Sequence, residues 1–97
     1  MKYVMIRTYA MGVFAGYLDE TESTETKKVL KDARRIWYWE GAASLSQLAM
    51  EGTSLPDKCK FPIEVSRVEL TSPQGFEMLD VMEKARESIK SVKIWTA

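Results

Sequence analysis

The hydrophobic pattern at the start of the chain predicts a β-hairpin. Residues 2–9 alternate in polarity and are rich in β-branched and aromatic side chains, which favours a strand. A turn at residues 10–12 contains glycine, and residues 13–18 predict a second strand that runs back beside the first. Because Gly16 lies inside this second strand, we expect a β-bulge or a close backbone approach there.

The middle of the chain combines an acidic loop with a long apolar and aromatic segment. Residues 19–25 are polar and acidic, which is typical of a solvated loop. Residues 26–39 end in a run of arginines and aromatic residues, and we interpret them as one long, irregular strand. We expect its alternation to be interrupted by a β-bulge near Asp32 and Ala33.

Two segments have the spacing and the end signals of short helices. Residues 44–51 begin with Ser44 as the predicted N-cap, and a glycine follows their last turn. Residues 80–91 begin with Asp80, another side chain suited to the N-cap position. Apolar residues recur in this second segment at four-residue spacing: Val81, Ala85 and Ile89.

The remaining segments complete a small sheet. Residues 63–70 alternate in polarity and predict a strand, and residues 76–79 and 92–96 predict two shorter ones. No linker or internal repeat divides the chain, so residues 1–97 are expected to form a single domain. The predicted fold class is α+β, a small antiparallel sheet of about five strands, opening with the hairpin and accompanied by two short helices.

The charge balance bears on which partners the protein can bind. Lys and Arg together number 14, and so do Asp and Glu, so the formal net charge is zero. Proteins that bind duplex DNA usually carry a clear basic excess, so duplex DNA is not an expected partner. Several of the acids lie together in residues 19–25, and the rest of the chain therefore has a positive balance that allows a local basic pocket.

The chain contains no histidine and one cysteine. Without histidine it lacks the commonest general base, the usual Ser-His and Cys-His pairs and most kinds of zinc site. We therefore expect a protein that is not an enzyme and that holds no cofactor or metal. Cys59 lies between Lys58 and Lys60 in a proline-bounded loop, and we expect it to be a lone surface thiol.

The N-terminal segment does not have the pattern of a targeting or membrane sequence. It is apolar, but it carries Arg7 and lacks a long uncharged stretch. We expect no membrane partner and a cytoplasmic location.

The segment 33–39 concentrates the side chains that are best suited to binding. In an extended strand, Arg35, Trp37 and Trp39 would project to one face. The other face would carry Arg34, Ile36 and Tyr38. Arginine binds phosphate through a bidentate fork, and an aromatic face stacks on a nucleobase for roughly 1–3 kcal/mol. The alternative is structural, since aromatic residues of a small domain usually lie in the core with arginine stems packed over them.

A third arginine lies in the first predicted strand. Arg7 shares a face with Met5 and Tyr9, so its charge stands in an apolar and aromatic row. Such a charge is either paired with a carboxylate or used to contact a ligand. The candidate ligand-binding residues are Arg7, Tyr9, Arg34, Arg35, Trp37, Tyr38 and Trp39.

The segment Ala33-Arg34-Arg35-Ile36-Trp37-Tyr38-Trp39-Glu40-Gly41-Ala42, with Arg7-Thr8-Tyr9 before it, resembles a family of small proteins of tailed phages and prophages. The family is catalogued only as a domain of unknown function. Its Ala-Arg-Arg-hydrophobic-Trp-x-Trp-x-Gly-Ala core is the specific part of the resemblance. The resemblance implies a phage accessory protein that acts in the bacterial host cytoplasm, and it implies no reaction.

Four functions follow from these observations. The first is an anti-defence protein, a homo-oligomer that sequesters a small anionic nucleotide-like ligand, such as a second messenger, without catalysis. The second is a protein–protein interaction module, anchored by Trp37 and Trp39, that inhibits a host protein or serves a phage complex. Single-stranded nucleic-acid binding is the third, and zero net charge argues against it. An enzyme is the last, because no persuasive general base is present.

Overall fold

The structure, a computed structural model, describes all 97 residues and has an α+β fold with an antiparallel sheet, as the sequence predicts. The elements are β1 (Tyr3–Thr8), β2 (Gly12–Leu18), β3 (Lys27–Arg35), α1 (Leu45–Glu51), a 3-10 helix η1 (Pro56–Lys58), β4 (Val65–Thr71), β5 (Glu77–Asp80) and α2 (Glu83–Ser91). The predicted N-terminal hairpin is present as β1 and β2. No helix has the length and the apolar character that crossing a membrane requires.

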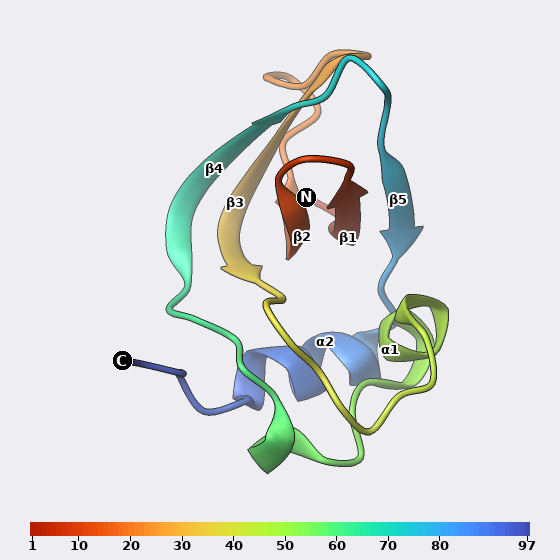
Figure 1. Ribbon diagram of the computed structural model, residues 1–97. Coiled ribbons are helices and arrows are strands. Elements are labelled where there is room, and N and C mark those ends of the chain that lie inside the picture. The colour runs from red at the N-terminus through yellow and green to blue at the C-terminus, as the bar shows by residue number, and fades with distance from the viewer.

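The sheet is strongly curled, and its strand order is β4-β3-β2-β1-β5 (Figure 1). Every pair of neighbours is antiparallel. Residues 72–76 carry the chain from β4 at one edge to β5 at the other, across the end of the curl (Figure 1). The segment between β3 and β4 contains α1 and η1, and both lie below the sheet in Figure 1.

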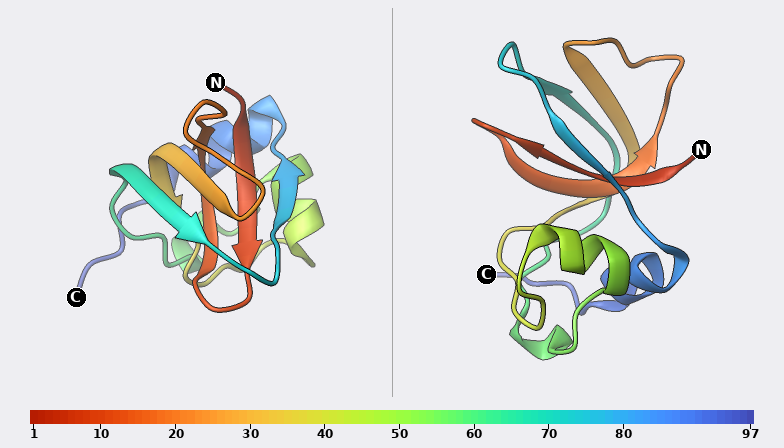
Figure 2. Two further views of the ribbon diagram at one scale, coloured as in Figure 1. Left: turned by 90° about the horizontal axis from the view of Figure 1, so that it is seen from above. Right: turned by 90° about the vertical axis from the view of Figure 1, so that its right-hand side faces the viewer.

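Both faces of the sheet are covered, so the protein has two apolar cores. The helix-side core lies between the sheet and the two helices, which occupy one side of it (Figure 2). The inner core fills the other side of the curl. The helix-side core consists of Tyr3, Met5, Ala15, Ile36, Leu48, Cys59, Phe61, Ile89 and Val92, and the inner core of Val4, Ile6, Phe14, Leu18, Leu30, Ala33 and Leu70. Residues 3–6 of β1 alternate between the two cores and are therefore all buried.

The predicted irregularity in β2 and β3 is confirmed as one β-bulge. Ala15 pairs with Arg34 and Tyr17 pairs with Lys31, so two residues of β3 face Gly16 alone. A Cβ atom on Gly16 would lie 2.8 Å from the Cβ of Ala33, which leaves room for no side chain. The extra residue in β3 is Asp32, whose φ of 47° lies in the left-handed region that aspartate tolerates.

The third strand is shorter than the sequence predicts. β3 ends at Arg35, and the prediction of strand for residues 36–39 is wrong. The Ile36 N–H still donates to the Val13 carbonyl at 2.8 Å, and Ile36 then enters the helix-side core. Beyond it the backbone leaves the sheet, and Tyr38 forms an isolated bridge with Lys60 instead.

The first helix has the predicted end signals. The Ser44 Oγ accepts a hydrogen bond from the Gln47 N–H at 3.2 Å, and the Gln47 side chain accepts one from the Ala43 N–H at 2.7 Å. Gly52 ends the helix with a φ of 79° and donates its N–H to the Leu48 carbonyl.

The second helix begins later than predicted. α2 starts at Glu83, and its N-cap residue is Met82 rather than Asp80. Asp80 instead ends β5, where it pairs with Val4 and its carboxylate lies 3.2 Å from the Lys2 ammonium. Strand pairing has therefore replaced the predicted capping role. The predicted strand at 92–96 is also absent, apart from one bridge between Ile94 and Phe61.

Candidate functional site

The two adjacent arginines at the end of β3 have opposite environments. Arg34 faces the helices, because it pairs with Ala15 on the helix-side face of the sheet. Its side chain is only 3% exposed, and all of its nitrogens are used. Its guanidinium donates to four carbonyls, those of Phe61 (2.7 Å), Pro62 (3.1 Å), Ile89 (2.9 Å) and Val92 (2.7 Å).

The contacts of Arg34 make it a structural residue rather than the predicted ligand contact. Two of its acceptors are carbonyls at the C-terminal end of α2, where a cation also complements the helix dipole. Burial lowers the pKa of the Arg34 guanidinium, but arginine retains its charge at any physiological pH. Arg34 therefore ties the sheet to the end of α2 and is not available to a phosphate.

Arg35 faces the opposite side and is exposed. It pairs with Phe14, and its guanidinium carbon lies 4.2 Å from the centre of that ring. Its Nη1 donates to the Met11 carbonyl at 3.0 Å. None of the protein's ion pairs includes Arg35, so its charge is not balanced by a carboxylate. The side chain is held in one orientation, and its charge remains available.

A cleft of about 400 Å³ lies beside this guanidinium. It is bordered by the β1–β2 turn on one side and by the end of β3 with the following residues on the other. Its lining residues are Ala10, Met11, Gly12, Val13, Arg35, Ile36, Trp37 and Trp39. Trp37 is 63% exposed, whereas Trp39 is half-buried and packs against the helix-side core. We call this the Arg35 cleft.

Tyr38 does not belong to the Arg35 cleft. Its hydroxyl donates to the Glu40 carboxylate at 2.6 Å, and this hydrogen bond raises the pKa of Tyr38. The Lys60 ammonium lies 5.6 Å from the Tyr38 ring and 5.8 Å from the Trp95 ring. Tyr38 therefore belongs to a cation–π cluster formed with the C-terminal segment.

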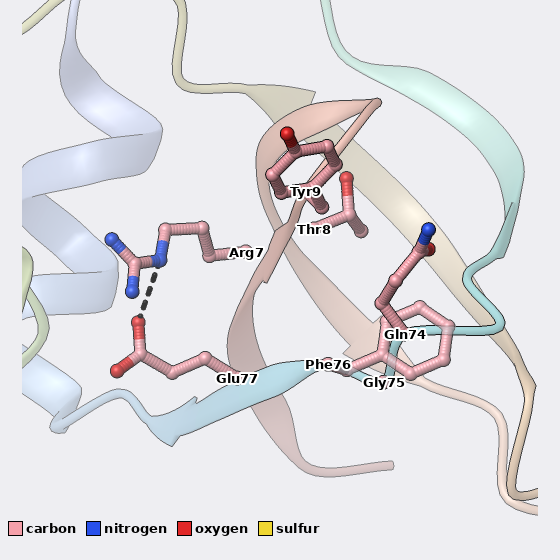
Figure 3. Close-up of a pocket in the computed structure, with 7 residues that line it drawn as sticks. All are labelled: Arg7, Thr8, Tyr9, Gln74, Gly75, Phe76 and Glu77. Carbon is pink, nitrogen blue, oxygen red and sulfur yellow. Dashed lines mark ion pairs between the residues drawn. The ribbon is translucent and has the colours of Figure 1, made fainter.

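Arg7 and Tyr9 line a separate hollow of about 540 Å³. The Arg7 Nε lies 3.0 Å from a carboxylate oxygen of Glu77, so the ion-pair interpretation of this residue is confirmed. Figure 3 shows Arg7 and Glu77 directed toward each other, on the opposite side of the strands from Gln74 and Phe76. Since its charge is balanced and its position is outside the Arg35 cleft, Arg7 does not complete a clamp with Arg35.

Three of the seven predicted residues, Arg35, Trp37 and Trp39, thus lie together in one cleft. Sequence reasoning missed Met11 and Val13, which form its other wall. The predicted hairpin could have indicated this wall. A third strand that pairs antiparallel with β2 must end near the start of β2, which is the β1–β2 turn. The position of that end depends on the bulge opposite Gly16, which the sequence places only approximately.

Cys59 is buried, which corrects the predicted surface thiol. Its sulfur packs in the helix-side core near the carbonyls of Glu40 and Leu55, at 3.5 Å and 3.6 Å. Of the two neighbouring lysines, Lys60 places its ammonium over the Tyr38 ring. No group of three or more Cys, Asp or Glu residues is placed to hold a metal ion.

Tyr3 is the one buried polar side chain without a hydrogen-bond partner. It is 5% exposed, and its ring meets that of Tyr17 edge to face at 4.9 Å. Burial, assisted by the nearby charge of Glu64, raises the pKa of the Tyr3 hydroxyl well above its usual value. The folded protein therefore keeps this hydroxyl neutral under conditions in which the unfolded chain ionises it.

Removing that hydroxyl is expected to stabilise the protein. Tyr3→Phe should raise the free energy of unfolding by about 1 kcal/mol at neutral pH, since a buried donor without a partner is lost. Above about pH 10 the unfolded chain ionises Tyr3, whereas the folded protein, in which its pKa is raised, does not. The wild type therefore loses stability as the pH rises there and the variant does not, so the difference between their free energies of unfolding should widen. Urea unfolding at neutral and alkaline pH measures both effects. The exposed Tyr9→Phe serves as the control, and a destabilised Tyr3→Phe would contradict the prediction.

Comparison with known proteins identifies a family without assigning a function. Searches of curated proteins and of solved structures find no match to the chain. A family model described as a domain of unknown function (DUF6948) matches residues 1–89. The match covers every strand, α1, the Arg35 cleft and most of α2. The chain therefore belongs to the DUF6948 family.

Proposed function

We propose that the protein binds and sequesters a small, nucleotide-derived anion in the Arg35 cleft without transforming it. The observation that carries the proposal is that Arg35, an arginine with no carboxylate partner, lines the same cleft as Trp37, which is largely exposed. An unbalanced cation and an exposed aromatic face are the two features that a phosphate and a nucleobase require.

The orientation of Arg35 favours anion binding. Its Nη1 already donates to the Met11 carbonyl, and its guanidinium carbon lies over the Phe14 ring. Its Nε and Nη2 make no hydrogen bond within the protein, and these two donors form the edge that grips a phosphate bidentately. Because the side chain is already held in place, little rotamer entropy is lost when a ligand binds.

The dimensions of the Arg35 cleft match a small ligand rather than a polymer. Its volume of about 400 Å³ lies within the range of roughly 300–1,000 Å³ that is typical of small-molecule sites. Trp37 and Trp39 offer stacking surfaces, while Met11 and Val13 give the opposite wall an apolar lining. The zero net charge of the chain argues against a long nucleic acid, whose binding depends on many phosphate contacts.

The resemblance to phage and prophage proteins supplies the biological setting of the proposal. In that setting the protein is an accessory factor that acts in the bacterial cytoplasm and counters a host defence. Capturing a signalling nucleotide stoichiometrically needs affinity but no general base, and this agrees with a chain that has no histidine.

Calorimetry with 3′,5′-cyclic GMP, cyclic di-GMP and ADP-ribose tests this function. We expect at least one of these probes to bind and Arg35→Gln to weaken its binding by roughly tenfold or more, because the bidentate phosphate contact is lost. Trp37→Ala should weaken binding through lost stacking, and Trp37→Phe should restore part of it. The control is Arg7→Gln, which removes a charge from the other hollow and should leave the affinity unchanged.

Two outcomes would contradict the proposal. One is the absence of binding across the panel. The other is binding that Arg35→Gln and Arg7→Gln weaken equally, which would show that the contact is not made in the Arg35 cleft.

A second function, a protein–protein interaction module, is favoured by the exposure of Trp37 itself. A tryptophan that is 63% exposed resembles the anchors that dominate protein interfaces. In that case Trp37→Ala abolishes capture of a specific host or phage protein, while the nucleotide panel gives no heat of binding with the wild-type protein.

A further inference from the structure

The two edges of the sheet differ in how well they are protected from pairing. β5 forms one edge, is only four residues long and carries the carboxylates of Glu77 and Asp80 near its ends. Pairing β5 with another β5 would bring these like charges together. β4 forms the other edge, is seven residues long and contains no proline, and no segment pairs with its outer side (Figure 1).

The pairing of β4 with β3 determines which backbone groups remain free. The Ser72 N–H, just beyond β4, donates to the Thr26 carbonyl beside β3. Leu70 and Val68 lie two and four residues before Ser72 in the same register, so their backbone groups also point toward β3. Backbone groups alternate in direction along an antiparallel strand. The outward N–H and C=O groups of β4 therefore belong to the odd-numbered residues, Val65, Arg67, Glu69 and Thr71.

We propose that two copies of the chain form a homodimer by pairing their β4 strands antiparallel about a twofold axis at Val68. In this register the outward backbone groups of Arg67 meet those of Glu69 in the second copy, and Val65 meets Thr71 in the same way. The two sheets become continuous, and each copy covers the other's free edge.

The charges of β4 select this register over its neighbours. Sliding one β4 strand by one residue along the other would place outward backbone groups opposite inward ones. Only registers that pair odd-numbered residues with odd-numbered residues can therefore compete. One competing register places Arg67 opposite Arg67 of the second copy, and the other places Glu69 opposite Glu69. Only the register centred on Val68 places each Arg67 opposite a Glu69, and cross-strand pairs of opposite charge are favourable whereas like charges are not.

The side chains around this edge leave room for the extra contact. In the single chain Arg67 uses only Nη2 in its ion pairs with Glu22 and Glu69, both at 3.1 Å, so its other nitrogens remain free for the second copy. Ile63 and Val65 are 62% and 40% exposed beside the edge, and pairing would shield part of this apolar surface. The inference rests on the sheet edge alone and is independent of the Arg35 cleft.

Charge reversal tests the dimer and its register together. Sedimentation equilibrium over micromolar to millimolar concentrations should show a reversible dimer for the wild type. Arg67→Glu and Glu69→Lys should each raise the dimer dissociation constant by about tenfold or more, because each places like charges opposite one another. An equimolar mixture of the two variants should recover a heterodimer, since every cross-strand pair is then again of opposite sign.

The outcomes that would overturn the inference are equally direct. A wild type that stays monomeric throughout this range has no such interface. Variants that dimerise as well as the wild type, or a mixture that recovers no heterodimer although both variants are folded by circular dichroism, would show that β4 pairing in this register is not the contact. The Arg7→Gln variant, near the β5 edge, should dimerise like the wild type.

Discussion

Replacing Arg34 with leucine is expected to lower the free energy of unfolding by about 3–5 kcal/mol, the largest effect of any single substitution considered for this protein. The guanidinium donates to four backbone carbonyls, and three of its hydrogen bonds are 2.9 Å or shorter. Leucine would leave the buried carbonyls without this donor and would remove the cation at the end of α2. Lysine should recover only part of the loss, because one ammonium cannot reach four acceptors in a plane.

The neighbouring arginine provides a matched control for this prediction. Arg35→Leu removes an exposed guanidinium with one hydrogen bond and no ion pair, so it should change the free energy of unfolding by less than about 1 kcal/mol. Urea unfolding of the two leucine variants at neutral pH measures the difference. Equal stabilities for the two variants would contradict the structural role assigned to Arg34.

The second large effect is expected from adding one methyl group at the β-bulge. Gly16→Ala should cost about 2–3 kcal/mol, because the new Cβ would lie 2.8 Å from the Cβ and 2.9 Å from the Cα of Ala33. Both residues belong to paired strands, so neither backbone can move without breaking the sheet. Chemical denaturation of the variant measures this cost.

Steric and conformational causes can be separated with two further variants. Adding Ala33→Gly to Gly16→Ala removes the shortest contact, the one with the Ala33 Cβ, and leaves the 2.9 Å contact with the Cα of residue 33. The double variant should therefore be more stable than the sum of the single effects predicts, by about 1 kcal/mol, while remaining less stable than the wild type. Gly75→Ala is the comparison for backbone strain alone, since its φ is 97° and a Cβ there meets no atom within 4 Å. Strictly additive effects of Gly16→Ala and Ala33→Gly would contradict a clash between the new Cβ and the Ala33 side chain.

The hairpin and the bulge were predictable because their causes are local. The alternation in residues 2–9 and 13–18 specifies two strands, and a glycine inside a strand signals a bulge or close contact. Capping is local too, and the predicted Ser44 is the N-cap of α1. Asp80 had the same local signal but was wrongly predicted as a cap, because its pairing with Val4 joins residues far apart in the chain.

The different burial of Arg34 and Arg35 could not be predicted from the sequence. Alternation correctly places the two side chains on opposite faces of a strand, but it does not say which face is buried. That is decided by the end of α2, whose carbonyl acceptor on Ile89 lies 55 residues away in sequence. Trp37 and Trp39 share the Arg35 cleft for a different reason from the one predicted, since β3 has already ended before them.

The proposed ligand site contains Arg35, Trp37 and Trp39, and the third tryptophan, Trp95, lies outside the cleft that they line. The three indole N–H groups give separate signals in a nitrogen–proton correlation spectrum, so one titration with cyclic di-GMP, 3′,5′-cyclic GMP or ADP-ribose follows all of them. We expect the indole signals of Trp37 and Trp39 to shift on binding, the Trp95 signal to stay in place, and Arg35→Gln to suppress the shifts. Binding that moves only Trp95, or no indole shift with any of the three probes, would contradict the proposed site.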